Sequence, residues 1–314
     1  MGRPLRVSFY GAGQVGKNAS GILRGREGIE VLGPFDRTQR DEALLGGADV
    51  VVIATTSFLA GIADDVQAAV EAGSNVITTA EEAAAPWGND AATADRLDAL
   101  ARSRGVTILG AGVNPGFAFD ALVLTACGVV AQVDSLLVER VVDLSGFGAN
   151  VLRRIGVGHT PEAFEEGRRS GTVTGHIGFP QSMRVVAGGL GVAIERIDRE
   201  LEPIFADTEL AASSLTVAAG QTAGFRQQYR AVTAGEHTWF EALFTGHVAP
   251  LSIGQEPRDS ITVRSPGGDV HFAATPGINP QTGSASVIAN SVRRVATARP
   301  GWITVAELPP AVPA

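Results

Sequence analysis

Two adjacent glutamates, Glu81 and Glu82, are the residues of this chain best suited to acid–base chemistry. They directly follow an apolar segment at residues 75–79, which is typical of a short strand. A carboxylate in a partly desolvated cleft can take up and release protons near neutral pH. Because neighbouring residues at a strand end point in different directions, we expect only one of the two to be catalytic, and we favour Glu81. The alternative is that both only cap or solvate the loop at residues 83–87.

A glycine-rich turn near the start of the chain is suited to binding phosphates. The turn GAGQVG, at residues 11–16, joins an apolar strand pattern at residues 5–9 to a helical pattern at residues 15–23. In such a turn the glycines allow a tight bend, a close approach of the backbone to a pyrophosphate, and close packing of helix on strand. The helix start adds free N–H groups and the positive end of the helix dipole. We therefore predict a dinucleotide site with contacts from Gly11, Gly13, Gln14, Val15 and Gly16.

The residues after the second apolar segment bear on which dinucleotide binds. Asp36 stands twenty residues past Gly16 and follows an apolar run at residues 29–32. An acidic residue at this place typically accepts hydrogen bonds from the adenosine ribose, which favours NAD. Arg37 and Thr38 come next and could bind a 2′-phosphate, so NADP stays open. The alternative is that residues 36–38 form only a solvated turn.

Three loops are expected to carry the chemistry of a parallel sheet, because ligands bind beyond the carboxyl ends of its strands. They lie at residues 54–57, 80–82 and 111–116. The first contains Thr55, which we expect to contact the cofactor. The last contains Asn114, which would bind the substrate or the nicotinamide, or would instead cap a helix starting at Phe117.

The five histidines show no spacing typical of metal ligands, and the chain has one cysteine, so we predict no metal site. His176 stands in a turn before a helical pattern and is the histidine that we consider for a pocket. His237 and His247 flank a predicted strand and are expected to be structural. No sequence signature of a covalent hydrolase is present.

The elements that position these residues predict an α/β protein of two domains. Strand and helix patterns alternate up to about residue 120, which indicates a doubly wound parallel sheet of the Rossmann type in a domain at residues 1–120. Two-periodic segments then dominate and predict an open, mainly antiparallel sheet in an α+β substrate and dimerisation domain at residues 121–283. A helix and tail at residues 284–314 are expected to pack back on the first domain. An open sheet of this size commonly pairs with a second copy, so we expect a homodimer.

Composition excludes several classes of partner. The 314 residues suit two domains, and the net charge of −8 without a basic cluster argues against nucleic acid. No apolar run reaches the roughly 20 residues of a membrane helix. A strand pattern that starts at Leu5 leaves no room for a signal peptide, and the lone Cys127 can form no internal disulfide. We therefore expect a cytoplasmic protein with a small-molecule partner.

Five motifs, in this order, resemble a known family. They are GAGQVG, VITTAEEAAAPW, LGAGVNPGFAFD, ERVVDLSGFG and GHIGFPQSM, and the ending SASVIANSVRRVATARPGWITVAELP is similar as well. Together they resemble 2,4-diaminopentanoate dehydrogenase and the related native amine dehydrogenases over nearly the whole chain. The resemblance implies a dimeric fold related to dihydrodipicolinate reductase. It also implies NAD(P)-dependent oxidative deamination, or the reverse reductive amination of a ketone or aldehyde with ammonia.

The same resemblance implies site residues. The catalytic glutamate falls on Glu81 or Glu82, and the pocket-lining segments carry over to Asn114, Phe117, Phe119, Arg140 and His176. Two other functions stay open at this point. One is a different NAD(P)-dependent imine or carbonyl reductase on the same scaffold, and the other is a dinucleotide-binding regulator without turnover. Lys17 is the only lysine and lies in the first helical pattern, which disfavours relatives that depend on cleft lysines.

Overall fold

The computed structural model describes residues 2–313. The chain divides into two compact units, which are described separately. The first unit comprises residues 1–124, 180–191 and 279–314, and the second comprises residues 125–179 and 192–278. Among the described residues, no helix has the length and apolar character needed to cross a membrane.

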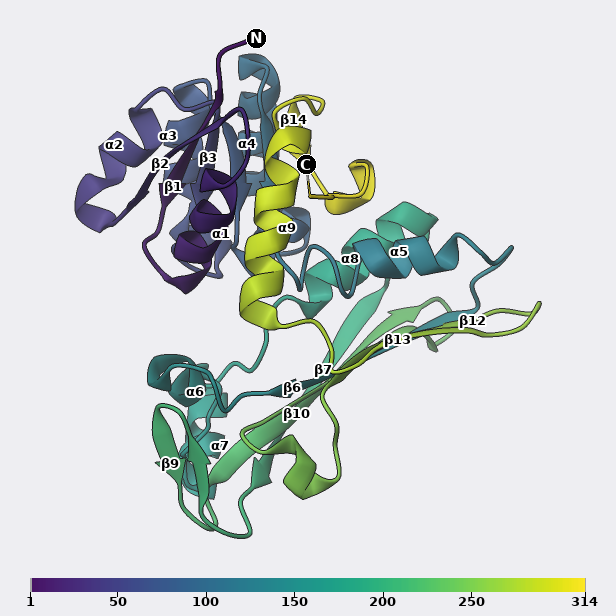
Figure 1. Ribbon diagram of the computed structural model, residues 1–314. Coiled ribbons are helices and arrows are strands. Elements are labelled where there is room, and N and C mark those ends of the chain that lie inside the picture. Colours follow the sequence, from purple (N-terminus) through teal and green to yellow (C-terminus); the bar gives the residue numbers. More distant parts are fainter. Residues whose placement is uncertain (1, 314) are drawn as a thin grey trace. The chain divides into compact units, whose positions relative to one another are not determined.

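The first unit is built on a six-stranded sheet in which every neighbouring pair is parallel. Its strand order is β14-β5-β4-β3-β1-β2, and Figure 1 labels most of these strands. The strands are β1 (Leu5–Tyr10), β2 (Ile29–Phe35), β3 (Val50–Ile53), β4 (Asn75–Thr78), β5 (Thr107–Gly110) and β14 (Gly301–Ile303).

Helices cover both faces of this sheet, which explains why its strands are apolar on both sides. One core joins alternate strand residues such as Val7 and Val52 to α1 and α9, which lie side by side in Figure 1. The other core joins the intervening residues, such as Val51, to α2, α3 and α4. The helices that cover the sheet are α1 (Gln14–Arg24), α2 (Arg40–Leu45), α3 (Ala63–Glu71), α4 (Ala91–Arg104) and α9 (Pro280–Val295). The unit also contains α8 (Phe179–Leu190), nearly all of which belongs to it.

Short 3-10 turns, rather than long loops, follow several strands of the first unit. They place polar residues at fixed positions just beyond the carboxyl ends. They are η1 (Arg37–Gln39), η2 (Leu59–Gly61), η3 (Glu81–Ala84) and η4 (Pro86–Gly88), and a further turn, η6 (Val305–Glu307), follows β14. Helix α5 (Ala121–Cys127) spans the boundary between the two units.

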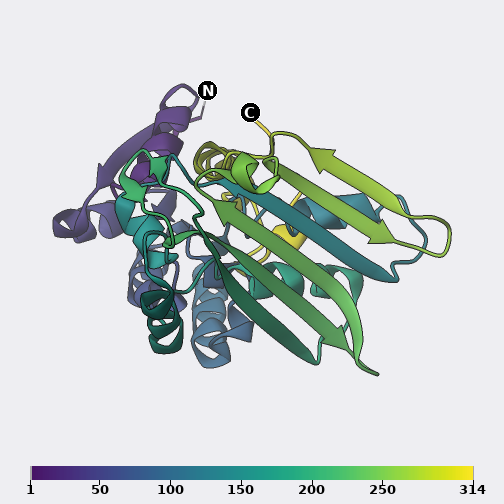
Figure 2. The ribbon, with the colours of Figure 1, turned by 90° about the horizontal axis from the view of Figure 1, so that it is seen from below.

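The second unit contains a six-stranded sheet of order β13-β12-β6-β11-β10-β7, whose strands fan out side by side in Figure 2. Only the pair β6 and β11 is parallel, and the other four pairs are antiparallel. Its strands are β6 (Ser135–Asp143), β7 (Arg196–Phe205), β10 (Thr222–Thr233), β11 (His237–His247), β12 (Arg258–Arg264) and β13 (Val270–Ala274). The unit also holds α6 (Ala149–Arg154), α7 (Pro161–Ser170), the turn η5 (Pro250–Ile253), and the hairpin of β8 (Leu210–Ala212) with β9 (Leu215–Val217).

The predicted fold class is confirmed: a Rossmann-type parallel sheet is followed by an open, mainly antiparallel one. The sequence missed β14, which extends the first sheet beside β5 although it stands in the segment expected to form only a helix and tail. Three residues are too short to show a period, so only pairing with β5 reveals this strand. Residues 180–191 also belong to the first unit, although they stand in the middle of the second unit's sequence.

Candidate functional site

The glycine turn between β1 and α1 has the form needed to receive phosphates. Gly11 has a φ of +122°, and a Cβ there would lie 2.4 Å from the carbonyl oxygen of Ala54. A Cβ on Gly16 would lie 2.1 Å from the carbonyl oxygen of Gly11. At Gly13, in contrast, no atom lies within 4 Å of the position of a Cβ. The first and third glycines are therefore needed for packing, and the second leaves open space in front of the helix.

The start of α1 lacks the groups that usually satisfy a helix N-terminus. Its N-cap is Gly13, no side chain caps it, and its first turn holds no acidic residue. Unpaired N–H groups with the positive end of a helix dipole behind them favour an anion. The turn therefore fits the pyrophosphate of a dinucleotide, and Gln14 and Val15 supply the first N–H groups of the helix.

The adenosine side of such a ligand would meet Asp36, directly after β2. The Asp36 side chain accepts hydrogen bonds from the backbone N–H of Thr38, at 2.8 Å, and from its hydroxyl, at 2.6 Å. These bonds lower the pKa of Asp36, so the side chain stays a carboxylate at neutral pH. Asp36, Arg37 and Thr38 are all exposed. After β3, the hydroxyl oxygen of Thr55 is shielded from solvent and has no hydrogen-bond partner among the described residues.

Glu81 and Glu82 open the turn η3 after β4, and their surroundings differ. Both oxygens of Glu82 accept hydrogen bonds, one from the backbone N–H of Leu59 at 2.7 Å and one from the amide of Asn89 at 2.8 Å. Glu81 accepts a hydrogen bond of 3.1 Å from the hydroxyl of Ser57, in the loop after β3. Glu82 therefore ties together two turns of the first unit, whereas Glu81 lies against the loop that also carries Thr55.

Asn114 lies in a tightly held loop after β5 and is 8 % exposed. The loop is fastened by Asp120, which accepts hydrogen bonds from the backbone N–H groups of Gly116, at 2.6 Å, and Ala121, at 2.8 Å. Helix α5 begins only at Ala121, so Asn114 is not its N-cap and that alternative is wrong. Phe117 is half-buried and Phe119 is buried. Full burial raises the pKa of Asp120, and the donated hydrogen bonds oppose this rise.

In the second unit, Arg140 is buried on β6 and pairs with Asp259 of β12. The Nε of Arg140 lies 3.4 Å from Oδ1 of Asp259, and both side chains also hold the backbone of Ile278. Burial lowers the pKa of Arg140 and raises that of Asp259, while their mutual attraction opposes both shifts. Among the described residues, Nη1 of Arg140 has no hydrogen-bond partner. A buried guanidinium with donor capacity left is suited to an oxygen of a ligand.

His176 is held by its backbone and its ring. Gln227 of β10 accepts from the His176 N–H and donates to its carbonyl, both at 2.9 Å. The ring Nδ1 accepts a hydrogen bond from the Gly178 N–H, so the neutral imidazole carries its proton on Nε2. The ring centroid lies 5.0 Å from that of Phe179 and 5.6 Å from that of Phe244. His176 therefore belongs to an aromatic cluster of the second unit.

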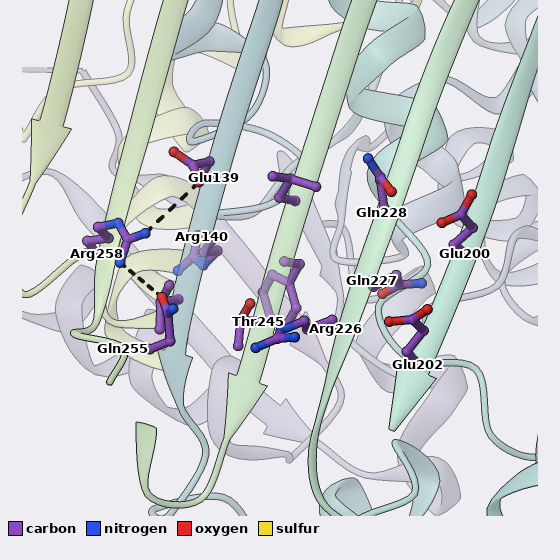
Figure 3. A pocket seen from close by; sticks show the side chains of 13 residues that line it. Glu139, Arg140, Glu200, Glu202, Arg226, Gln227, Gln228, Thr245, Gln255 and Arg258 are labelled. Atoms are coloured by element: carbon purple, nitrogen blue, oxygen red, sulfur yellow. Dashed lines mark hydrogen bonds and ion pairs between the residues drawn. The ribbon is translucent and has the colours of Figure 1, made fainter. Parts of the chain in front are cut away.

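The face of the second sheet opposite to Arg140 and Gln227 is half-exposed. Strand residues alternate, so that Arg140 and Gln227 are buried while Glu139 and Gln228 are half-exposed. A hollow of about 260 Å³ lies on the sheet, and Figure 3 shows the charged side chains that line it. Arg258 there lies 4.0 Å from Glu139 and donates to Gln255. The other charged residues of the hollow include Glu200, Glu202 and Arg226.

Sequence reasoning missed several buried polar residues that form hydrogen bonds with the candidate residues of their own unit or with the loops beside them. Asp120, Gln181, Ser182, Gln227 and Asp259 are buried and each bonds a loop or a residue named above. Gln181 and Ser182 stand within the motif GHIGFPQSM, so polar residues at the start of an otherwise apolar helix were the available signal. No group of side chains suited to a metal ion is present within residues 2–313.

Comparison with known proteins identifies the family of this chain. The 2,4-diaminopentanoate dehydrogenase C-terminal domain matches residues 117–314. The curated 2,4-diaminopentanoate dehydrogenase of Acetoanaerobium sticklandii is 29 % identical, with 97 % of this chain and 93 % of that protein covered.

Solved structures share the fold. An amine dehydrogenase from Mycobacterium smegmatis is 21 % identical with a TM-score of 0.81, and 99 % of this chain and 97 % of that chain are covered. The biliverdin reductase of Synechocystis sp. PCC 6803, solved with biliverdin and NADP+, is 13 % identical with a TM-score of 0.55, and 96 % and 94 % are covered. The chain belongs to the 2,4-diaminopentanoate dehydrogenase family, and it is an NAD(P)-dependent oxidoreductase that acts on CH–NH2 donors.

Proposed function

We propose that this protein interconverts a primary amine with a ketone or aldehyde and ammonia, and that Glu81 is its catalytic base. The observation that carries the proposal is the place of Glu81. It stands at the carboxyl end of β4, and its carboxylate accepts a hydrogen bond from the loop after β3, at the same sheet edge as the glycine turn of β1. Ligands of parallel sheets bind at this edge.

The reaction needs proton transfers that a carboxylate can perform. When bound, the dinucleotide accepts or returns the hydride of the amine carbon. In the oxidative direction, loss of that hydride and of a nitrogen proton leaves an imine on the substrate. Water then adds and ammonia leaves, which gives the carbonyl product. Glu81 would take the proton from ammonium in the reductive direction, because only neutral ammonia attacks a carbonyl.

The contacts of the two glutamates support a division of roles. Both carboxylate oxygens of Glu82 accept hydrogen bonds, one from Leu59 and one from Asn89. A proton transfer by Glu82 would therefore break structural hydrogen bonds. The hydroxyl that contacts Glu81 can rotate and can either donate or accept. We therefore assign proton transfer to Glu81 and a positioning role to Glu82.

The substrate would be held by the residues that the family resemblance implies. Asn114 offers an amide on a fixed loop, and Phe117 and Phe119 add apolar surface. In the second unit, taken by itself, Nη1 of the buried Arg140 has no hydrogen-bond partner among the described residues, and the ring of His176 is held by the N–H of Gly178. Amide and guanidinium donors of this kind each suit an oxygen acceptor of a small molecule.

Glu81→Gln tests the assignment, because it preserves shape and removes the base. It should lower ammonium-dependent turnover about 10²–10⁴-fold while binding of NAD(P)H stays nearly unchanged. Glu82→Gln should have a much smaller effect. The measurement is NAD(P)H consumption with a panel of carbonyls, with and without ammonium.

If the parent consumes NAD(P)H equally fast with and without ammonium, the protein would instead be an imine or carbonyl reductase. The carboxylate mechanism would be wrong if Glu81→Gln, Glu82→Gln and the double variant all kept ammonium-dependent activity within a few-fold of the parent. Absence of turnover in the parent with every carbonyl, despite cofactor binding, would favour a regulator.

We also propose a homodimer formed through the half-exposed face of the second sheet. On that face Leu137 and Leu243 stand beside acidic residues such as Glu139. The face also carries Arg226 and Arg258, so one surface holds both of the charges that pairing with a second copy could match. A cytoplasmic location remains our prediction as well. It is supported by Cys127, which can form no internal disulfide and whose thiol pKa burial raises to about 11.

A further inference from the structure

Helix α8 reaches two separate loops of the proposed site through adjacent side chains in its first turn. Gln181 is 2 % exposed and Ser182 is 1 % exposed. Residues 180–191 belong to the first unit, and Met183 and Val186 of this helix are fully buried. The helix is therefore packed firmly enough to serve as a support.

The first connection runs from Gln181 to the turn that carries Glu81. Gln181 Nε2 donates to Asn89 Oδ1 at 2.6 Å, and Asn89 Nδ2 donates to Glu82 Oε1 at 2.8 Å. Glu82 Oε2 in turn accepts from the backbone N–H of Leu59 at 2.7 Å. In each of these three hydrogen bonds the acceptor is on the side of Glu82. The direction of the whole series is therefore set by the negative charge of the Glu82 carboxylate.

The second connection runs from Ser182 to the loop that carries Asn114. Ser182 donates to Asp120 Oδ2 at 3.0 Å, and its Oγ lies 3.5 Å from Asn114 Oδ1. The same Asp120 oxygen accepts the N–H of Gly116 at 2.6 Å. A Cβ on Gly116 would lie 2.4 Å from the backbone of Gly112, so the loop has little freedom to find another shape.

We propose that Gln181 and Ser182 are positioning residues of the dehydrogenase site, which together fix the Glu81 turn and the Asn114 loop. This inference rests on the proposed function for its catalytic consequence. The geometric part stands on the hydrogen bonds alone. A misplacement of about 1 Å at a reacting group can lower a rate about 10²-fold. Hydrogen bonds that fix both loops to one helix would therefore keep the reaction rate high.

The two hydrogen bonds that join Gln181 to Asn89 and Asn89 to Glu82, here called the relay, can be tested by reversing their donor–acceptor direction. Gln181→Glu replaces the donor by an acceptor, so Asn89 would face carboxylates on both sides. In the double variant Glu82→Gln with Gln181→Glu, the Asn89 amide can turn over. It then donates to the new carboxylate at position 181 and accepts from the new amide at position 82, whose carbonyl oxygen still accepts from Leu59. All three hydrogen bonds are present again, and the two that involve Asn89 run in the opposite direction.

The readouts are kcat, KM and amide hydrogen exchange of residues 57–89. Gln181→Glu should lower kcat about ten- to hundredfold, leave the affinity for NADH within about twofold, and speed exchange in this segment. The double variant should recover most of the kcat and the slow exchange. Glu82→Gln alone should be mild, because Oε1 of Gln181 has no partner among the described residues and both amides can turn over.

Ser182→Ala tests the second connection and should lower kcat about tenfold and speed exchange at residues 112–121. Matched controls are Gln67→Glu, a glutamine of α3 that bonds only at the surface, and Ser103→Ala in α4. Both should match the parent.

Gln181→Glu with parental kcat and exchange, or a double variant no better than Gln181→Glu, would overturn the relay. Parental behaviour of Ser182→Ala would overturn the second connection. If the exchange results hold but the parent shows no ammonium-dependent turnover, the proposed function fails while the positioning of the two loops by α8 stands.

Discussion

At the scale of single residues, the three glycines of the first turn have different reasons to be glycine. Gly11 and Gly16 are required because a Cβ would overlap backbone atoms. Gly13 faces open space, so nothing in the folded chain itself requires it. A pyrophosphate bound at this turn would supply the missing reason, because it would occupy the space of a side chain.

Gly13→Val should therefore abolish NAD and NADP binding while the protein stays folded. The added side chain meets no protein atom but fills the place of the phosphates. Fluorescence titration with NADH and NADPH measures this, and Gly21→Ala, another open glycine of α1, is the matched control. Unchanged affinity in Gly13→Val would remove the support for a dinucleotide at this turn.

Asp36→Ala should shift the ratio of kcat/KM toward NADP. The exposed carboxylate would repel a 2′-phosphate, and the neighbouring Arg37 would attract one once the charge is gone. We expect the parent to accept both cofactors with a slight preference for NAD. Steady-state kinetics with both cofactors checks this, and an unchanged ratio would show that Asp36 does not face the ribose.

At the scale of elements, the strand β14 supports the turn η3, which carries Glu81 and Glu82, from the opposite end of the chain. Trp302 of β14 is 1 % exposed, and its indole N–H donates to the carbonyl oxygen of Ala83 in η3 at 3.0 Å. Close packing adds to this support, because a Cβ on Gly110 would lie 2.3 Å from the Ala83 carbonyl carbon. The turn with Glu81 and Glu82 is therefore held by β5 and β14 as well as by α8.

Trp302→Phe should lower the free energy of unfolding by about 1–3 kcal/mol, since it leaves the buried Ala83 carbonyl without its donor. Trp87→Phe is the matched control, because its indole N–H bonds Asp95 at the surface and Trp87 is 40 % exposed. That change should cost less than about 1 kcal/mol. Urea unfolding of both variants measures the difference, and equal losses would argue against the role of β14.

At the scale of the whole molecule, the second sheet has one buried face and one half-exposed face with mixed charges. The regular alternation in β6, β10 and β11 separates them, because successive strand residues point to opposite faces. The buried face holds Arg140, Phe244 and Gln227, and the other face forms the surface that we propose for the dimer.

Leu243→Glu should convert the proposed dimer to a monomer. It adds a negative charge opposite Glu139, in the middle of the proposed interface, and a dimer would have to bury both. Light scattering of the eluting protein measures the mass. Val129→Glu is the control, because Val129 is 68 % exposed in the loop before β6. A parent that is a monomer at micromolar concentration would contradict the proposal.

The sequence by itself determined the features that local spacing encodes. The glycine turn, the apolar strands with the helices between them, and the two-periodic strands of the second unit follow from periods of 3.6 and 2 residues and from backbone demands on glycine. These features predicted the fold class and the loops at the carboxyl ends of β3, β4 and β5.

Only the tertiary structure distinguished residues that are alike in sequence. Glu81 and Glu82 are adjacent and of one type, and what separates them is contact with Leu59, Asn89 and, through Asn89, Gln181 from distant parts of the chain. The three residues of β14 and the place of α8 in the first unit were likewise decided by partners rather than by pattern. Hydrogen bonds between residues far apart in sequence leave no period along the chain, so their effect becomes visible only once the chain is folded.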